Sequence, residues 1–313
     1  MNKLEIKNLK LSFSVDKYQL EALHGINLSL EQGKALGLVG ESGCGKSITA
    51  MSVMKLLPSN SIITSGEIFY NGKDILKMNN EELRKIRGKK IALIPQDPMT
   101  SLNPLYTIGE QILEAVELHS EYRGQKAKEI VINALKEVQI PDAAEKYNAY
   151  PHQLSGGMRQ RTIIAMALSC NSEVLIADEP TTALDVTVQA QILKLIKQIQ
   201  KEHNMSLLLI THDLGVVYNV CDEIAVMYLG NIVEQAETTE LFKNPKHPYT
   251  KALLSSLGEE RIVLKGQPPA LTEIFDGCKF NPRCQNCTDI CHEKIPDIID
   301  IGNRHLVSCL NIN

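Results

Sequence analysis

A chain of 313 residues exceeds the size at which one small core suffices, so we expect a main domain with a smaller extension. Hydrophobic residues make up 43% and charged residues 22% of the chain, which excludes a largely disordered protein, and the formal net charge of −4 leaves no global basic field to attract nucleic acid. No apolar stretch reaches the length of a membrane-spanning helix and the start lacks the apolar core of a secretory signal, so we expect a soluble protein that stays in the cytosol.

The N-terminal region is predicted to form β-strands that lead into a phosphate-binding turn. Apolar and polar residues alternate over residues 4–9, and further β-like runs follow at 26–30 and 35–39. A glycine-rich turn follows the last of these, and residues 47–57 then have the pattern of a helix that stops before Pro58. This order of strand, loop and helix is typical of phosphate-binding folds.

The glycine-rich turn reads Gly-Glu-Ser-Gly-Cys-Gly-Lys-Ser and matches the phosphate loop Gly-x-x-x-x-Gly-Lys-Ser. Backbone N–H groups of such a loop point toward phosphate oxygens, and the N-terminus of the following helix adds positive potential. Lys46 is predicted to reach the β- and γ-phosphates of ATP, and the Ser47 hydroxyl to bind Mg²⁺. The residues predicted to contact the nucleotide in this loop are Gly40, Glu41, Ser42, Gly43, Cys44, Gly45, Lys46 and Ser47.

The rest of the chain predicts an α/β fold with two additions. Short apolar strands at 90–94, 174–177, 207–210 and 224–228, most of them separated by helical segments, indicate a parallel α/β core. The pattern is helical from about residue 110 to about residue 169, which indicates an inserted subdomain, and Gly-Gln-Pro-Pro precedes a cysteine-rich tail. We expect a nucleotide-binding domain over residues 1–258, its helical subdomain at roughly 97–172, and a small Cys-rich C-terminal domain over 259–313.

Two carboxylates follow the predicted strand at residues 174–177. Ligands bind beyond the carboxyl ends of strands in open α/β sheets, which is where Asp178 and Glu179 lie. Asp178 is predicted to hold Mg²⁺, directly or through water, and Glu179 to polarise the attacking water as general base. An apolar strand followed by Asp-Glu is also a common strand exit, and it is the phosphate loop that favours the catalytic interpretation.

The segment Leu-Ser-Gly-Gly-Met-Arg-Gln at residues 154–160 resembles the signature motif of ATP-binding-cassette (ABC) ATPases, in the spacing that this family uses. Ser155, Gly156 and Gly157 open a helix and so provide a second set of exposed N–H groups suited to a γ-phosphate. Because the chain's own site already has such a helix, the motif, Gln160 included, is expected to serve the ATP of another subunit. An ordinary helix N-cap is the alternative without the flanking motifs.

The remaining motifs of the ABC family follow in order. Gln96 is similar to the Q-loop glutamine that contacts Mg²⁺ and water. Residues 183–185, Ala-Leu-Asp, resemble the D-loop and place Asp185 near the nucleotide, and His212 resembles the switch histidine that contacts the γ-phosphate. The resemblance implies that Gln96, Glu179 and His212 form the catalytic set.

The family resemblance also implies an aromatic residue against the adenine ring. Phe13 occupies the position where the family usually stacks an aromatic side chain on adenine. Tyr18 is a nearby rival, and a plain core role for Phe13 is the alternative. The whole resemblance spans residues 4–257 and implies an ABC-type phosphate-loop ATPase that uses ATP and Mg²⁺.

Some signature-type ATPases act on nucleic acid or ribosomes rather than in transport, so other features must indicate transport. Residues 96–104 resemble the peptide-importer version of the Q-loop, whose surface receives a coupling helix of a membrane subunit. Residues 244–254 closely resemble the element that follows the core in oligopeptide, dipeptide and nickel importer ATPases. The resemblance implies an ATPase subunit of a di- or oligopeptide importer. A nickel or metal-chelate importer, and a soluble ABC ATPase acting on nucleic acid or ribosomes, are the alternatives.

Five of the eight cysteines crowd the C-terminal tail. Cys278, Cys284, Cys291 and Cys309 resemble the cysteine-bearing C-terminal region of the importer family, which in some members holds a [4Fe–4S] cluster, and Cys287 is an alternate ligand. Four thiolates suit zinc as well, and unligated reduced thiols are a third interpretation. In a reducing cytosol a tight cluster favours a metal centre over a disulfide framework.

The family resemblance also implies partners and a location. Two cassettes are expected to close head to tail around two ATP molecules, and the second cassette is either a related, non-identical ATPase subunit or another copy of this chain. Two integral membrane permease subunits and an extracytoplasmic substrate-binding protein complete the expected importer, with no nucleic acid. The chain is then a peripheral subunit on the cytoplasmic face of the cell membrane.

Overall fold

The computed structural model describes residues 1–16, 18–182, 184–258, 262–264, 266–270, 272–273 and 275–312. The chain forms two compact units, of which unit 1 contains Met1–Leu76 and Leu209–Asn313 and unit 2 contains Lys77–Leu208. This division differs from the boundary predicted at residue 258. The C-terminal extension belongs to the same unit as the phosphate loop.

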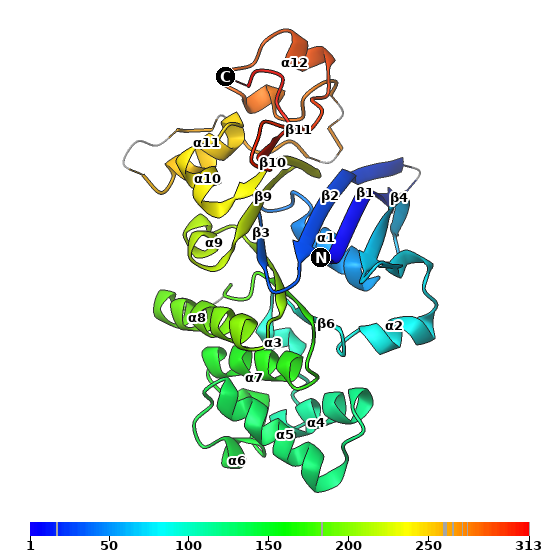
Figure 1. Cartoon of the computed structure of the whole chain (residues 1–313), viewed down its shortest axis with the longest axis vertical. Helices are drawn as coiled ribbons and strands as arrows, with labels where there is room; N and C mark the ends of the chain where they lie inside the picture. Colours follow the sequence, from blue (N-terminus) through cyan, green and yellow to red (C-terminus); the bar gives the residue numbers. More distant parts are fainter. Residues whose placement is uncertain are drawn as a thin grey trace. The chain divides into compact units, whose positions relative to one another are not determined.

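The first sheet of unit 1 is antiparallel, with the strand order β2-β1-β4-β5 (Figure 1). Its strands are β1 (Asn2–Val15), β2 (Tyr18–Glu31), β4 (Ser61–Tyr70) and β5 (Lys73–Asp74). The buried positions of β1 shift from Leu4 and Ile6 to Leu9 and Leu11, so the strict alternation of a flat strand is interrupted. A register shift between Ile6 and Leu9, with Asn8 at φ 46°, marks a β-bulge that returns the apolar side chains to the buried face.

The second sheet carries the predicted α/β core. In unit 1 its strands follow the order β11-β12-β10-β9-β3. They are β3 (Ala35–Val39), β9 (Glu223–Tyr228), β10 (Asn231–Glu237), β11 (Ile299–Asp300) and β12 (Leu306–Val307). Strand β3 pairs in parallel with β9, whereas β9 with β10 and β10 with β12 are antiparallel. All five residues of β3 are buried, as its unbroken apolar run predicts.

Helix α1 (Lys46–Met54) follows the phosphate loop and ends earlier than the predicted residue 57. Lys55 adopts a left-handed conformation at φ 48°, and its N–H donates to the carbonyl groups of Met51 and Ser52, which closes the helix. The other helices of this unit are α9 (Leu214–Val220), α10 (Thr238–Lys243), α11 (Pro248–Ser255), the 3₁₀ turn η3 (Asn281–Arg283) and α12 (Ile290–Glu293).

The C-terminal extension is built into unit 1 by a buried polar cluster. Strand β12 pairs with β10, where Val307 lies opposite Glu234. The fully buried carboxylate of Glu234 lies 2.7 Å from Nε2 of His305 and accepts hydrogen bonds from the backbone N–H groups of Lys246 and His247. A buried charge needs such partners, so the extension contributes part of the core of this unit.

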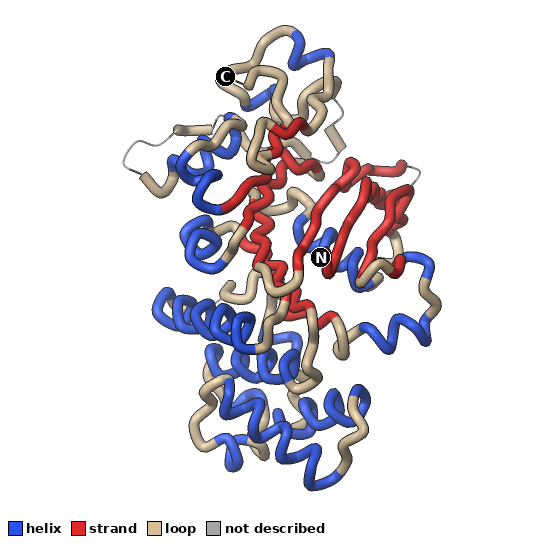
Figure 2. Tube along the Cα trace, viewed as in Figure 1, coloured by secondary structure: helices blue, strands red, loops and turns tan. Residues whose placement is uncertain are grey.

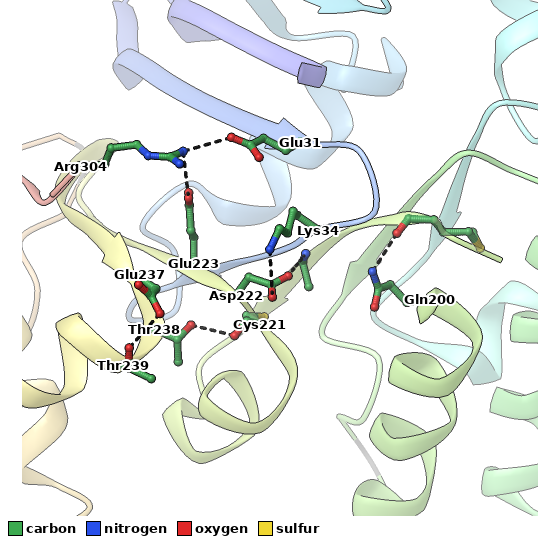
Figure 3. Close-up of polar contacts among 12 residues, drawn as sticks. Glu31, Lys34, Gln200, Cys221, Asp222, Glu223, Glu237, Thr238, Thr239 and Arg304 are labelled. Atoms are coloured by element: carbon green, nitrogen blue, oxygen red, sulfur yellow. Dashed lines mark hydrogen bonds and ion pairs between the residues drawn. The ribbon is translucent and has the colours of Figure 1, made fainter. Parts of the chain in front are cut away.

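A second, exposed contact joins the extension to the two sheets of unit 1. Arg304, in the turn before β12, forms ion pairs with Glu31 at the end of β2 (3.1 Å) and with Glu223 at the start of β9 (3.8 Å) (Figure 3). The Arg304 side chain is 77% exposed, so solvent screens both pairs.

Unit 2 contains the parallel strands β6 (Ile91–Ile94) and β7 (Val174–Asp178), with Ile94 opposite Ala177. Strand β8 (Ser206–Thr211) is divided between the two units, and in unit 2 it neighbours β7. The helices and turns are α2 (Asn80–Ile86), α3 (Pro98–Ser101), α4 (Ile108–His119), α5 (Gly124–Glu137), α6 (Ala143–Lys146), η2 (Pro151–Gln153), α7 (Gly156–Leu168) and α8 (Val186–Glu202); the 3₁₀ turn η1 (Ile75–Lys77) lies at the division.

The predicted helical subdomain is confirmed within unit 2, because helices predominate from α4 to α7 (Figure 2). Helix α4 shows how its sequence specifies it. Thr107 and Glu110 form a capping box at its start, and Ile108, Ile112 and Val116 recur every four residues as a buried stripe. Over the described ranges, no helix is both long and apolar enough to cross a lipid bilayer.

Candidate nucleotide site

Two glycines shape the phosphate loop between β3 and α1. Gly40 passes so close to the main chain of β9 that a Cβ would lie 2.2 Å from the carbonyl oxygen of Met227. Gly45 caps α1 at φ 110°, a conformation that glycine adopts without strain. The loop therefore ends at a helix N-terminus, whose first N–H groups have no acceptor within the helix and suit phosphate oxygens.

Lys46 lies buried inside this loop. Its Nζ donates hydrogen bonds to the carbonyl oxygens of Gly40 (2.8 Å) and Glu41 (2.9 Å) and lies 3.8 Å from Sγ of Cys44. A buried ammonium group is costly unless polar atoms surround it, and the two carbonyl groups meet that need. The phosphate-binding lysine predicted from the sequence is thus held within the loop by the loop's own backbone.

The loop residue Glu41 is held by the C-terminal part of the chain. Its carboxylate forms a two-pronged ion pair with Arg283, with 2.6 Å from Nη1 to Oε2 and 3.0 Å from Nη2 to Oε1. Its backbone N–H donates to the hydroxyl of Tyr249 at 2.9 Å. Hydrogen bonds from Arg283 to Glu41 raise the pKa of the guanidinium, which stays charged. The sequence did not single out Arg283 for this role, because 242 positions separate the two partners.

The other predicted residues of unit 1 lie on separate elements. His212 follows β8, which neighbours β3 in the strand order, and its side chain is exposed. The next residue, Asp213, caps α9 by accepting a hydrogen bond from the N–H of Val216 at 3.2 Å. Phe13 lies on β1 and is partly exposed, while Tyr18 is largely exposed. The adenine contact of Phe13 and the γ-phosphate contact of His212 stay predictions.

The predicted catalytic groups of unit 2 lie together where β6 and β7 end. Gln96 Nε2 donates to Oε2 of Glu179 at 3.1 Å, and the hydroxyl of Thr182 donates to the same oxygen at 3.0 Å. Glu179 has φ 46°, a strained backbone conformation for a residue with a side chain, and such strain is concentrated at functional sites. Asp178, the last residue of β7, is buried beside it. Thr182 is a member of this group that the sequence did not indicate.

The signature segment opens α7 as expected. Ser155 caps the helix, its hydroxyl accepting from the N–H of Met158 at 3.3 Å, and it is exposed. Gly157 lies so close to α8 that a Cβ would be 2.7 Å from Cγ1 of Val188. Gln160 differs from the expectation of a nucleotide contact. It is fully buried, and neither atom of its amide has a hydrogen-bond partner among the described residues, so its side chain cannot contact a nucleotide where it lies.

Asp185, in the segment that resembles the D-loop, caps α8. Its carboxylate accepts a hydrogen bond from the N–H of Val188 at 2.9 Å, and the side chain is otherwise exposed. Ala183, the first residue of that segment, lies outside the described residues. A contact of Asp185 with a nucleotide or a second cassette stays a prediction.

The five C-terminal cysteines are free thiols in one region of unit 1, and their donor chemistry suits a soft metal centre. Burial raises the pKa of Cys278 and Cys309, and raises that of Cys284 to about 11, whereas hydrogen bonds from Thr288 and other neighbours help to lower that of Cys291. In the part of the chain that the structure describes, however, no three metal-binding side chains come together as a ligand group. The cluster and the zinc ion therefore stay predictions.

A buried lysine in a glycine-rich loop and a carboxylate group beyond β7 define the chain as a phosphate-loop ATPase with an α/β fold. Comparison with known families narrows this class. Residues 23–182 match the family described as ABC transporter, and residues 233–291 match the oligopeptide/dipeptide transporter C-terminal region. The chain belongs to the ABC transporter family and is an ATP-hydrolysing subunit, for which ATP and Mg²⁺ are the expected ligands.

Relatives and solved structures agree with this assignment. The dipeptide transport ATP-binding protein DppD of Bacillus subtilis (strain 168) is 46% identical, covering 98% of this chain and 93% of its own length. The oligopeptide transport ATP-binding protein OppD of the same organism is 45% identical, covering 97% of this chain and 87% of its own length. A dimeric structure of MJ0796, a bacterial ABC transporter cassette, has a TM-score of 0.67 at 28% identity, covering 75% of this chain and 98% of the cassette. The predicted ABC fold is confirmed.

Proposed function

We propose that this chain energises an ABC importer for di- or oligopeptides. The observation that carries the proposal is the match of residues 233–291 to the C-terminal region of oligopeptide/dipeptide transporters, in a chain whose relatives DppD and OppD match over nearly its full length. Those relatives are named for dipeptides and oligopeptides, which favours peptides over the nickel and metal-chelate alternatives.

The described contacts support a division of roles in ATP hydrolysis. In unit 1, Lys46 releases its hydrogen bonds to the loop carbonyl groups and binds the β- and γ-phosphates instead. The N–H groups of the loop and of α1 bind phosphate oxygens. Ser47 in unit 1, and Gln96 and Asp178 in unit 2, are the residues that would supply oxygen ligands to Mg²⁺, which would neutralise charge on the phosphates. In unit 2, Glu179 accepts a proton from the attacking water, oriented by the side chains that donate to its carboxylate.

A second cassette completes this scheme. Ser155, Gly156 and Gly157 at the start of α7 present N–H groups that bind the γ-phosphate of the ATP held by the other cassette. The second cassette is a related ATPase or another copy of this chain. Two permease subunits and an extracytoplasmic binding protein make up the rest of the importer, with this chain on the cytoplasmic face of the membrane. Hydrolysis then reopens the closed pair of cassettes.

The proposal can be tested by purifying a tagged full-length chain from its native membranes in mild detergent. We expect it to co-purify with two integral membrane proteins, and the complex in lipid vesicles to hydrolyse ATP faster when di- or oligopeptides and the binding protein are added. Stimulation by nickel or a metal chelate instead of peptides would contradict the substrate class. Recovery with ribosomes or nucleic acid, and without membrane proteins, would contradict transport.

The [4Fe–4S] cluster stays a prediction that rests on the resemblance of the cysteine-bearing tail to that of the importer family. The described geometry does not favour it. Iron and zinc content, and absorption near ~400 nm, of chain purified without oxygen decide between cluster, zinc and free thiols. A preparation with neither metal leaves free thiols as the answer.

A further inference from the structure

Arg283, in the C-terminal extension, contacts the phosphate loop. Arg283 ends the 3₁₀ turn η3, and its guanidinium holds the carboxylate of Glu41, the second residue of the loop. We propose that Arg283 is a positioning residue for ATP binding, which fixes the loop in the shape that receives the phosphates. The proposal rests on the proposed role of the phosphate loop and adds to it a residue from outside the ATPase motifs.

Each polar group of Glu41 has a partner, and the three partners differ in kind. The carboxylate is held by Arg283, the backbone N–H donates to the hydroxyl of Tyr249, and the backbone carbonyl accepts from Nζ of Lys46. Lys46 also holds the carbonyl of Gly40. The loop backbone at Glu41 is therefore anchored from the C-terminal side by Arg283 and Tyr249, and from the inside by the phosphate-binding lysine.

Binding of ATP changes which side chains hold the loop backbone at Glu41. When Lys46 turns toward the phosphates it gives up hydrogen bonds to the loop carbonyls, and the contacts of Glu41 to Arg283 and Tyr249 then become the main restraint on that stretch of backbone. A loop without this restraint would have to be ordered at the moment of binding, which weakens affinity. Arg283 is thus expected to matter more for the ATP-bound state than for the free protein.

The surroundings of Arg283 make it a rigid anchor. Its side chain is 5% exposed, and its guanidinium lies 5.9 Å from the centre of the Tyr228 ring. Tyr228, Tyr249 and Phe280 form a compact aromatic group with ring centres 4.7 to 5.5 Å apart, in which Phe280 directly precedes η3 and the Tyr249 hydroxyl contacts the loop. A two-pronged arginine–carboxylate pair in such a setting fixes direction as well as distance, which a lysine cannot reproduce.

The test measures equilibrium binding of Mg-ATP, with a fluorescent ATP analogue as probe, to the full-length chain. We expect Arg283→Met to weaken affinity about five- to twentyfold, and Arg283→Lys to recover part of the loss. Glu41→Gln should weaken it similarly, and the double variant should be no weaker than either single one, because both remove the same pair. In the assembled transporter the KM for ATP should rise by the same factor while kcat stays unchanged.

Arg304→Met is the matched control. Arg304 also links the extension to the rest of unit 1, through Glu31 and Glu223 (Figure 3), but it does not contact the loop. We expect its ATP affinity to stay within about twofold of that of the unaltered chain. Equal loss of affinity in Arg304→Met and Arg283→Met would overturn the proposal, since general loosening of the extension would then explain both.

Lys46→Ala distinguishes failure of the proposed nucleotide site from failure of the proposed role of Arg283. If Lys46→Ala binds ATP normally, the proposed site itself is wrong. If Lys46→Ala loses ATP while Arg283→Met and Glu41→Gln bind it as tightly as the unaltered chain, only the role of Arg283 is overturned. Should Arg283→Met not fold, Glu41→Gln decides alone: weakened ATP binding at an unchanged melting temperature supports the positioning role, and unchanged binding overturns it.

Discussion

The phosphate loop of unit 1 and the catalytic edge of unit 2 are built in opposite ways. The loop is braced by buried and charged contacts, with Lys46 inside it and the pair of Arg283 and Glu41 against it. At the edge of unit 2, Glu179 is held by two hydrogen bonds from uncharged side chains that are exposed to solvent, and its backbone is strained. The described contacts of the loop are thus buried and partly charged, whereas those of the proposed catalytic carboxylate come from exposed, uncharged side chains.

This difference indicates how the two regions contribute. A preorganised loop lowers the cost of ordering when ATP binds, so it contributes mainly to affinity. The proposed general base is held by exposed side chains, so we expect turnover to depend also on the groups that complete its surroundings, including those of the proposed second cassette. Changes in the loop should therefore act on binding, and changes at the edge of unit 2 on turnover.

The largest expected effect is on turnover, from Glu179→Gln. The amide keeps the shape of the side chain and an oxygen for Gln96 and Thr182, but it cannot take a proton from water. We expect ATP hydrolysis by the assembled transporter to fall about 10²- to 10⁴-fold with ATP binding intact, as phosphate release and nucleotide titration would show. Glu173→Gln, just before the start of β7, is the control and should stay close to normal. Normal turnover in Glu179→Gln would remove its role as base.

Lys46→Ala is expected to lower ATP affinity, as Glu179→Gln is expected to lower turnover. Loss of the ammonium group from the loop should weaken ATP affinity by about 3 kcal/mol, or roughly a hundredfold, because a charged contact with the phosphates disappears. Titration with Mg-ATP measures the loss. Lys55→Ala removes the lysine that follows the other end of α1, where its Nζ donates to the carbonyl of Leu76, and should leave affinity unchanged. Similar losses in both variants would mean that the helix, not the loop, is being disturbed.

The neighbouring residues His305 and Arg304 test whether burial determines how much a polar contact stabilises unit 1. His305→Ala leaves the carboxylate of Glu234 buried without its side-chain partner, so we expect a loss of about 2–3 kcal/mol in the free energy of unfolding. Arg304→Ala breaks only exposed ion pairs and should cost under about 1 kcal/mol. Urea denaturation followed by circular dichroism compares the two. Equal losses would show that burial does not distinguish these contacts.

The sequence predicted those parts of the site whose residues lie close together along the chain. The order of strand, loop and helix around Lys46 follows from local pattern, because glycines at the turn and a run of apolar residues before it leave few other conformations. The placement of Gln96 beside Glu179 could also be expected, since each follows a strand of the same parallel pair. Local pattern was sufficient for the loop, whereas Gln96 was identified from the resemblance to the ABC family.

Contacts between distant segments could not be predicted in this way. Nothing in the residues around Arg283 indicates that it holds Glu41, and nothing around residue 258 indicates that β12, which follows it, pairs with β10, which precedes it. Motif membership also does not fix the direction of a side chain. Gln160 belongs to the signature segment and yet is buried, because helix α7 turns it away from the exposed face that Ser155 occupies.

Thr182 is a residue that only the structure brings into the site, and it should give the smallest effect. Thr182→Val keeps the shape of the side chain but removes the hydroxyl that donates to Glu179 at 3.0 Å. Loss of one hydrogen bond to a carboxylate that Gln96 still holds should cost about 1 kcal/mol, or roughly fivefold in kcat, with the KM for ATP unchanged. Steady-state phosphate release by the assembled transporter measures it. Thr182→Ser retains the donor and should stay near normal. If Thr182→Ser lowers kcat as much as Thr182→Val, the loss does not follow the hydroxyl, and Glu179 does not depend on this contact.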